Sequence, residues 1–469
     1  MFFHSLPSLL IFLPLIFSFY PLFKIYRFKF AKIFLLIFSI VFYGFDIPWF
    51  IIPLLISAFS DFIISRILIT DYRLSKFQRI FYLSLSLIIN IGLLFLFKYY
   101  DLFIDTFKLN SFGILKSNNL LLPAGISFYT FQTLSFTIDS FKKKIFFKPN
   151  FLDYLLFVCY FPQLVAGPIL RPNQFFDNKG KPLLSKKVNL RNSGFTRICY
   201  GLFLKLCLAD QLAFFNDRAF DGDYLLYSSI DSITMAFGFG LQIYFDFSAY
   251  SHMAIGISEI IGLPISENFK FPYNSKSVTE FWRKWHISLS SWVKDYLYTF
   301  LKIKIPNYLF SLFPLLLTWT IMGLWHGASW RFAIWGALNS IFIFIHRIYK
   351  SILDKYNYAG INSLFSWILS LISIMSSWIY FRSSSWEQAN HLFRKFYLFN
   401  SFELNLENNY YILVFAFSFL CLFSGFIFNI RKFDYLYKSI TVRLLSSSFL
   451  LAFAIIFINN QSSFIYFQF

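Results

Sequence analysis

The chain has 469 residues, of which 57% are hydrophobic and only 14% are charged, and its mean hydropathy is +0.59. Soluble domains carry about 25% charged residues, so this composition excludes an ordinary soluble protein and predicts an all-α integral membrane protein. The formal net charge is +19. Because the basic residues cluster in short loops between apolar runs, they follow the positive-inside bias of membrane proteins, and no nucleic-acid partner is expected.

The chain begins with an apolar run, Leu6 to Phe23, which Lys24, Arg27 and Lys29 follow closely. No basic segment precedes this run, and no small-residue cleavage site follows it. We therefore expect an uncleaved first span with an external N-terminus.

Further spans follow along the chain, since a transmembrane helix needs about 20 mostly apolar residues. Candidate apolar segments begin near residues 6, 33, 49, 80, 120, 151, 196, 232, 249, 307, 330, 363, 409 and 444. Loop charge predicts that residues 66–79 and 431–443 are cytoplasmic and that residues 216–231 and 400–408 are external. We expect one polytopic domain over residues 1–469, divided into N-terminal spans (1–119), a core (120–390) and C-terminal spans (391–469).

Residues 151–170 do not fit a simple crossing, because basic loops flank them on both sides. The segment contains Pro162, Gly167 and Pro168, and proline breaks helices. Irregular backbone at membrane depth is tolerated where protein or water covers it. The pattern predicts a re-entrant or broken element that lines an internal cavity; a proline-kinked ordinary span is the alternative.

Residues 278–301 show the spacing of one amphipathic helix. Its apolar stripe comprises Val278, Phe281, Trp282, Trp285, Leu289, Trp292, Val293, Tyr296, Leu297 and Phe300. A basic, tryptophan-rich amphipathic helix is typical of the membrane interface.

Two of the six histidines each follow a tryptophan, in Trp285-His286 and Trp325-His326. Ionisable groups in membrane-grade sequence are usually functional, and histidine suits proton transfer near neutral pH. The residues alone leave structural roles open, as an interfacial side chain for His286 and as a hydrogen-bonding link between helices for His326. The four cysteines, which form no CxxC pair, predict neither disulfides nor a metal site.

The histidines belong to a series of ordered sequence blocks. These are Pro123–Gln132, Phe161–Ile169, Leu241–Ser248, Glu267–Phe269, Phe281–Trp292 and Gly323–Ala328. Together the blocks resemble the membrane-bound O-acyltransferase (MBOAT) family, in particular its alginate O-acetyltransferase-like members, over about residues 120–390. Two stretches depart from the family pattern, namely Ala249 with His252 and the short loop from Lys302 to Asn307.

The resemblance implies a multi-span helical funnel with re-entrant or broken helices and an interfacial amphipathic helix. It implies that His326 is the catalytic histidine and that His286 is a second, less uniformly essential one. Further residues are expected along the donor and substrate path: Arg283, Trp285, Gln242, Asp246, Asn268 and Trp325. No metal and no bound cofactor are expected.

The implied function is transfer of an acyl group, most simply acetyl, from a cytoplasmic donor such as acetyl-CoA. The acceptors would be hydroxyls of an extracytoplasmic polysaccharide or envelope glycan, as in alginate or exopolysaccharide modification. The expected location is the bacterial inner membrane, and the expected partners are the bilayer, the donor and the acceptor, with a periplasmic acetyltransferase partner left open. The alternatives are D-alanyl transfer to a teichoic-acid-like polymer and a non-enzymatic transporter or flippase. The absence of a visible internal repeat weakens the transporter alternative.

Overall fold

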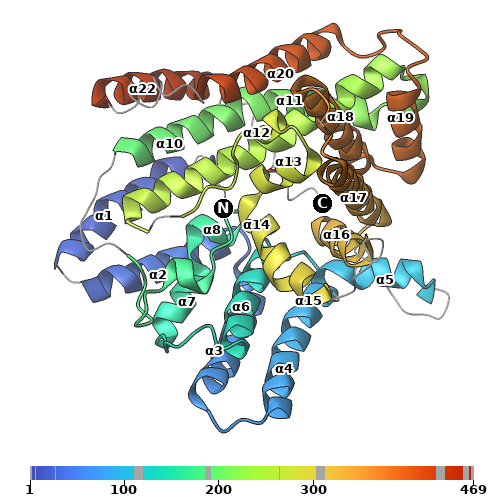
Figure 1. Ribbon diagram of the computed structural model, residues 1–469. Coiled ribbons are helices and arrows are strands. Elements are labelled where there is room, and N and C mark those ends of the chain that lie inside the picture. The colour runs from blue at the N-terminus through green and yellow to red at the C-terminus, as the bar shows by residue number, and fades with distance from the viewer. Residues whose placement is uncertain are drawn as a thin grey trace. The chain divides into compact units, whose positions relative to one another are not determined.

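The computed structural model describes residues 3–5, 7–26, 28–109, 120–184, 192–263, 265–302, 312–358, 360–428, 439–457 and 464–465. Over these residues the secondary structure is helical, apart from an isolated bridge between Phe176 and Pro182 (Figure 1). The predicted all-α fold is therefore confirmed. The chain forms two compact units: unit 1 is Met1–Ile198 with Tyr250–Ser266, and unit 2 is Cys199–Ala249 with Glu267–Phe469.

Several helices have the length and composition of membrane spans. Among the described residues they are Pro48–Thr70, Lys76–Thr106, Ser193–Asp221, Trp330–Tyr356 and Ser363–Arg382. Shorter apolar helices occupy Ser8–Lys24, Leu312–His326, Asn408–Phe423 and Thr441–Ile456. The spans predicted to begin near residues 49, 80, 196, 330 and 363 are therefore present, and the protein is a multi-span membrane protein.

Unit 1 contains the N-terminal helices. They are a π-helix (Ser8–Phe12), α1 (Leu13–Tyr26), α2 (Phe28–Gly44), α3 (Ile51–Thr70), α4 (Lys76–Leu94), a second π-helix (Phe95–Tyr99), α5 (Tyr100–Thr106), α6 (Ile126–Phe141), α7 (Phe151–Cys159), α8 (Phe161–Leu164) and α9 (Pro172–Phe175). A buried polar network ties α3 to α4, since Ser86 and the Nδ2 of Asn90 both donate to the carboxylate of Asp61. Buried polar groups of this kind need such partners.

The segment at 151–170 is broken, as its prolines and glycine predict. Helix α7 ends at Cys159 and is buried from Asp153 onward, and α8 covers only Phe161–Leu164 and is buried throughout. The side-chain amides of Gln132 and Gln163 donate to the carbonyl of Phe157, which supplies the partner that a helix end otherwise lacks. The broken backbone is thus confirmed, whereas its lining of a cavity stays a prediction.

Unit 2 contains further α- and π-helices. They are a π-helix (Leu204–Ala209), α11 (Asp210–Asp221), α13 (Val278–Lys284), α14 (Ile287–Trp292), a further π-helix (Val293–Tyr298), α15 (Thr299–Leu301), α16 (Leu312–His326), α17 (Trp330–Tyr356), α18 (Ser363–Arg382), α19 (Trp386–Leu398), α20 (Asn408–Phe428) and α22 (Ile440–Ile456). Two helices belong partly to each unit, α10 (Asn192–Phe203) and α12 (Ser229–Ile261). The separate segments expected near 232 and 249 are one 33-residue helix, α12, because no proline interrupts it.

The single amphipathic helix expected over 278–301 is wrong at one point. The chain leaves helical geometry between α13 and α14, at Trp285 and His286. The reason is tertiary: the peptide N–H of Ile287 donates to the carbonyl of Asn268 at 2.9 Å instead of continuing the helical ladder. The apolar stripe is buried from Val278 to Tyr296, whereas Phe300 at its end is 82% exposed.

The two acidic loops predicted to be external contact each other within unit 2. Arg218 pairs with Glu407 at 2.8 Å, and the Nδ2 of Asn405 donates to Asp231 at 3.0 Å. These contacts place the two loops next to each other. The external location of both loops and the cytoplasmic location of residues 66–79 stay predictions, and residues 431–438 of the other predicted cytoplasmic loop lie outside the described residues.

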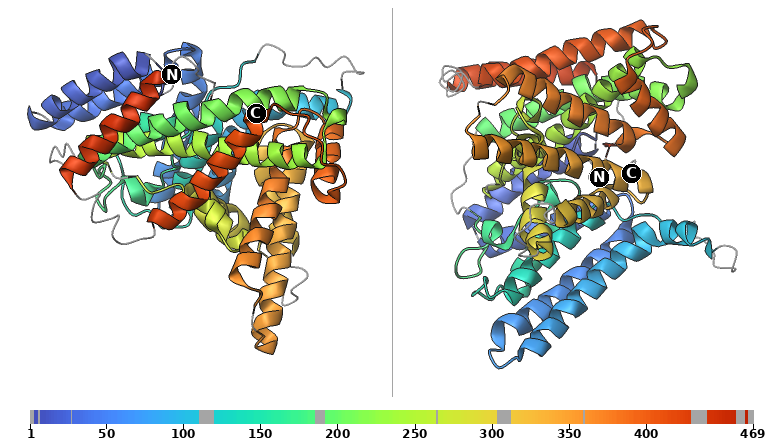
Figure 2. Two further views of the ribbon diagram at one scale, coloured as in Figure 1. Left: turned by 90° about the horizontal axis from the view of Figure 1, so that it is seen from above. Right: turned by 45° about the vertical axis from the view of Figure 1, so that its right-hand side comes forward.

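Helices α16 and α17 lie side by side and pack closely through glycine (Figure 2). A Cβ on Gly323 would lie 1.9 Å from the carbonyl oxygen of Phe332, and one on Gly336 would lie 2.0 Å from that of Trp319. Since such distances are forbidden, only glycine permits this approach of the two backbones. The close packing fixes the position of His326, the last residue of α16.

Candidate active site

Unit 2 contains a partly open cavity of about 430 Å³, and both histidines singled out by the sequence line it. His286 comes from the junction of α13 and α14, and His326 from the end of α16. Trp282, Trp319 and Met322 contribute to the apolar part of the lining. Two imidazoles forty positions apart in sequence therefore face one mostly apolar space.

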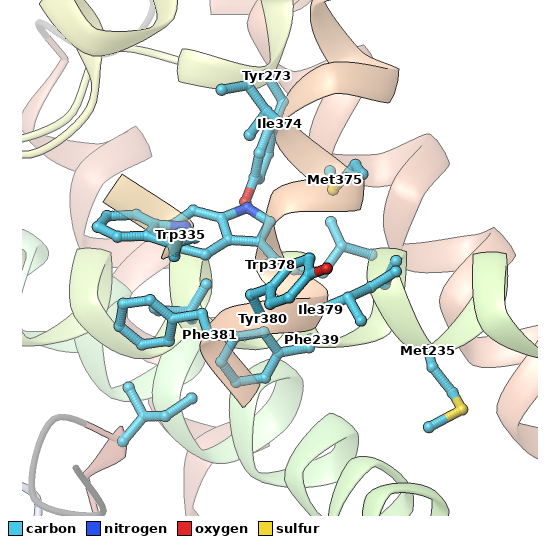
Figure 3. Packing of buried hydrophobic residues seen from close by; sticks show 14 of the residues in the cluster. Met235, Phe239, Tyr273, Trp335, Ile374, Met375, Trp378, Ile379, Tyr380 and Phe381 are labelled. Carbon is cyan, nitrogen blue, oxygen red and sulfur yellow. The ribbon is translucent and has the colours of Figure 1, made fainter. Parts of the chain in front are cut away.

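Aromatic rings pack around His326. Its ring centroid lies 4.8 Å from that of Trp325, 5.1 Å from that of Trp335 and 5.3 Å from that of Phe381. Trp335 in turn stacks on Trp378 at 5.6 Å, in the buried aromatic cluster shown in Figure 3. The imidazole is only 8% exposed. These contacts restrict the orientation of the His326 ring and exclude water from its sides.

His286 adopts a left-handed backbone conformation, with φ 42° and ψ 57°. For a residue other than glycine this costs about 1–3 kcal/mol and persists only where the surroundings impose it. Asn268 imposes it here: its carbonyl accepts from Ile287, and its side-chain oxygen accepts from both the N–H and the hydroxyl of Ser288 at 3.2 and 2.9 Å. The buried Asn268 thus holds both residues that follow His286.

The same asparagine sets the tautomer of His286. The Nδ1 of His286 lies 3.2 Å from the Oδ1 of Asn268. That atom must be the oxygen, because it accepts the backbone N–H of Ser288. An oxygen cannot donate, so Nδ1 carries the proton and Nε2 carries the lone pair.

Burial lowers the pKa of the His286 imidazole from its ordinary 6.5 to about 3. The ring is therefore neutral at physiological pH, and its Nε2 remains a hydrogen-bond acceptor. A base with so low a pKa removes protons weakly. The environment of His286 thus favours orienting or hydrogen-bonding work over proton abstraction.

Cationic side chains also line the cavity. Arg283, Lys294 and Arg347 line it, together with the hydroxyl-bearing Tyr298. A second, more polar hollow of about 660 Å³ shares Arg283 and Arg347 with the first and adds Lys350, together with the carboxylates of Glu280 and Asp354. The mostly apolar chamber therefore adjoins a region with a small excess of positive charge, which favours anions.

The residues predicted along the donor and substrate path divide into two groups. Arg283 and Trp285 line the cavity. The side chain of Asn268 hydrogen-bonds to His286, and the ring of Trp325 packs on that of His326. Neither Asn268 nor Trp325 is part of the described cavity lining, and the same holds for Gln242 and Asp246.

Gln242 and Asp246 belong to buried polar clusters of α12. The Oε1 of Gln242 accepts from Asn216 at 2.7 Å. Asp246 pairs with Lys205 at 3.1 Å. The roles of both residues along the path stay predictions.

Sequence reasoning missed Arg347, Trp319 and Tyr298, which line the same cavity. Arg347 lies within α17. The sequence feature that could have identified it is a cation within the helix that follows the Trp-His-Gly block. Trp319 carries no signal beyond helical spacing, since it lies seven residues before His326 on the same helix.

Comparison with known proteins identifies the family of this chain. Residues 85–386 match the model of MBOAT, the membrane-bound O-acyltransferase family. The chain belongs to this family and is a membrane-bound acyltransferase. The choice left open between an enzyme and a transporter is therefore decided in favour of the enzyme.

Individual relatives indicate which members of the family the chain is similar to. The chain is 34% identical to a peptidoglycan O-acetyltransferase of Helicobacter pylori over 391 residues, which is 77% of this chain and 72% of that protein. It is 34% identical to the probable alginate O-acetylase AlgI of Azotobacter vinelandii over 416 residues, 86% of this chain and 80% of that one. A teichoic acid D-alanyltransferase of Bacillus subtilis is 26% identical over 256 residues, 52% of this chain and 64% of that one.

Proposed function

We propose that this protein moves an acetyl group from a cytoplasmic thioester donor such as acetyl-CoA to hydroxyls of an extracytoplasmic polysaccharide, and that it does so in the bacterial inner membrane. The observation that carries the proposal is the common cavity lined by His286 and His326. The similarity to O-acetylases of alginate and peptidoglycan supports acetyl as the group and a glycan as the acceptor.

His326 acts as the general base in this proposal. It takes the proton of the acceptor hydroxyl while the hydroxyl oxygen attacks the thioester carbonyl. The new C–O bond forms, the C–S bond breaks, and the proton passes to the departing thiolate. The aromatic rings around His326 keep water from competing with the acceptor.

His286 orients the reacting group. Its pKa of about 3 and its fixed tautomer support a role through hydrogen bonding at Nε2 rather than through titration. The left-handed backbone at this residue supports the same view, because strain of this kind is concentrated at functional sites.

In this proposal, the anionic part of the donor binds next to Arg283 and Arg347. Arg283 and Arg347 line both hollows, so they are suited to bind phosphates while the thioester enters the apolar chamber. The basic loops predicted to be cytoplasmic support entry of the donor from that side.

The direct test uses purified protein reconstituted in liposomes. Labelled acetyl-CoA is supplied on the side of the basic loops, and an acetyl-free polysaccharide on the other side. Acetyl ester appearing on the polysaccharide is the expected result. If the well-folded protein neither transfers the label to the polysaccharide nor releases it by hydrolysis, acetyl-CoA is not the donor.

One observation favours a second candidate, D-alanyl transfer, namely the similarity to teichoic acid D-alanyltransferases. That reaction also moves an acyl group from a thioester to a hydroxyl. The same liposomes distinguish the two when a D-alanyl thioester on a carrier protein replaces acetyl-CoA. The O-acetylase relatives cover more of this chain at higher identity, which favours acetyl.

Replacing Arg283 with alanine should raise the KM for acetyl-CoA by about tenfold, the effect of one lost charge-assisted contact of about 1.4 kcal/mol. The kcat should change little, because the thioester is unaffected. The difference from the wild type should shrink with added salt, because salt screens the attraction that Arg283 exerts in the wild type. Steady-state kinetics with varied donor provide the measurement.

The control for Arg283 is Arg394→Ala, which removes the same charge from an exposed position on α19, outside both hollows. Equal effects of the two variants would show that Arg283 acts only through net charge. An unchanged KM in Arg283→Ala would remove Arg283 from the donor site.

Replacing His286 with glutamine should reduce kcat partially, by about tenfold, since a hydrogen-bonding group remains but the fixed imidazole is lost. Asn268→Ala should have a similar effect, because it frees the tautomer and the ring orientation of His286. The double variant should be no worse than either single variant, since both changes remove one interaction. The measurement is kcat at saturating donor. If the effects of the two changes multiply in the double variant, Asn268 does not act through His286.

A further inference from the structure

Residues near the C-terminus enter the interior of unit 2. Phe464 is 1% exposed and Ile465 is fully buried. They make two adjacent contacts with α12: the N–H of Ile465 donates to the Oδ2 of Asp246 at 2.8 Å, and the ring of Phe464 packs on that of Phe247 at 6.1 Å. Consecutive residues of the C-terminal segment thus meet consecutive residues of one helix.

Asp246 belongs to a buried charge cluster. The Nζ of Lys205 lies 2.8 Å from Asp210 and 3.1 Å from the Oδ1 of Asp246, and the side chains of all three residues are at most 2% exposed. One oxygen of Asp246 therefore faces the lysine, and the other accepts from the C-terminal segment. A buried carboxylate needs such partners, and Lys205 and the N–H of Ile465 supply them to Asp246.

Phe247 connects this anchor to the candidate active site. Its ring meets the imidazole of His286 edge to face, with centroids 4.6 Å apart and planes at 86°. The Phe247 ring is fully buried, so it transmits any displacement of its neighbours. His286 is thereby held by Asn268 through a hydrogen bond and by Phe247 through packing.

We propose that Phe464–Ile465 is a positioning element of the acyl-transfer site. The segment is anchored on Asp246 of the Lys205–Asp210–Asp246 cluster and orients His286 through Phe247. The inference rests on the proposed function of His286, and it gives the buried charge cluster a role without contact with substrate. Neither residue of the segment is part of the cavity lining described above.

Two variants with matched controls test the proposal in the reconstituted full-length protein. Ile465→Pro removes the N–H that Asp246 accepts, whereas Ile465→Val keeps it. Phe464→Ala removes the ring beside Phe247, whereas Phe464→Leu keeps most of its volume and guards against loss of folding. We expect Ile465→Pro and Phe464→Ala to lower kcat by about tenfold or more, as small misplacements near a reacting group do. The KM for acetyl-CoA should stay within about twofold, and both controls should resemble the wild type, because the cavity itself is unchanged.

A spectroscopic readout separates positioning from mere loss of stability. In protein labelled with ¹⁵N-histidine, the His286 signals are assigned by their disappearance in His286→Gln. Phe464→Ala should shift these signals, whereas Phe464→Leu should shift them less. Unshifted signals, or an activity loss that appears only in the KM for the donor, would overturn the proposal.

Failure of the proposed function remains distinguishable in the same experiment. If wild-type protein transfers no acetyl group, the proposed reaction is wrong, and the histidine spectra still decide whether the segment positions His286. If the wild type is active and Ile465→Pro is equally active, the reaction stands and the positioning role is wrong.

Discussion

Replacing His326 with glutamine should lower acyl transfer by about 10²–10⁴-fold, the contribution of a general base. Glutamine retains hydrogen-bonding capacity and similar size, but it cannot accept the proton of the acceptor hydroxyl. The variant should fold normally, since the tight packing of α16 depends on Gly323 rather than on the imidazole. The measurement is acetyl ester formed on the polysaccharide at saturating acetyl-CoA.

His286→Gln is the matched comparison, because it makes the same chemical change at the other imidazole of the cavity. We expect it to retain about a tenth of the activity, as argued from its hydrogen-bonding role. Normal transfer by a well-expressed His326→Gln protein would exclude His326 as the base. Equal inactivity of the two variants would assign both histidines to the chemical step.

Replacing Gly323 with alanine should both destabilise the protein and remove its activity. The added Cβ would lie 1.9 Å from the backbone oxygen of Phe332, and a backbone atom cannot yield as a flexible side chain can. Helices α16 and α17 must separate, at a cost of at least about 1–3 kcal/mol, the range for overpacking. Since His326 lies one turn further along α16, it moves with the helix.

The control is Gly92→Ala on α4, where an added Cβ meets no atom within 4 Å. Alanine favours a helix over glycine by about 1 kcal/mol, so this variant should unfold at the same or a higher temperature and remain active. Thermal unfolding in detergent and acetyl transfer provide the two measurements. A Gly323→Ala protein as stable and as active as Gly92→Ala would show that the close approach of α16 and α17 is not required.

The sequence alone was sufficient for the class of protein and for the search for a site. Its apolar composition and loop charges predict a multi-span helical membrane protein, because exclusion of apolar surface from water depends on composition rather than on detailed contacts. The prolines and glycine of 151–170 predict a broken element, and the backbone is broken there. The ordered blocks predict the acyltransferase family, and they single out His286 and His326.

Other features depended on contacts between distant parts of the chain. The apolar period over 278–301 continues without interruption, yet the helix breaks at His286, because Asn268 from a preceding loop takes the hydrogen bonds that the helix would have used. Periodicity reports which face is apolar and does not report whether the backbone hydrogen bonds continue.

The common cavity and the C-terminal anchor were likewise decided by tertiary structure. Arg347 and His286 line one cavity, and Ile465 donates a hydrogen bond to Asp246, which lies 219 positions earlier in the sequence. Local patterns carry no information on such pairs. They form only when the helices pack, since burial then requires each polar group to find a partner, wherever in the chain it lies.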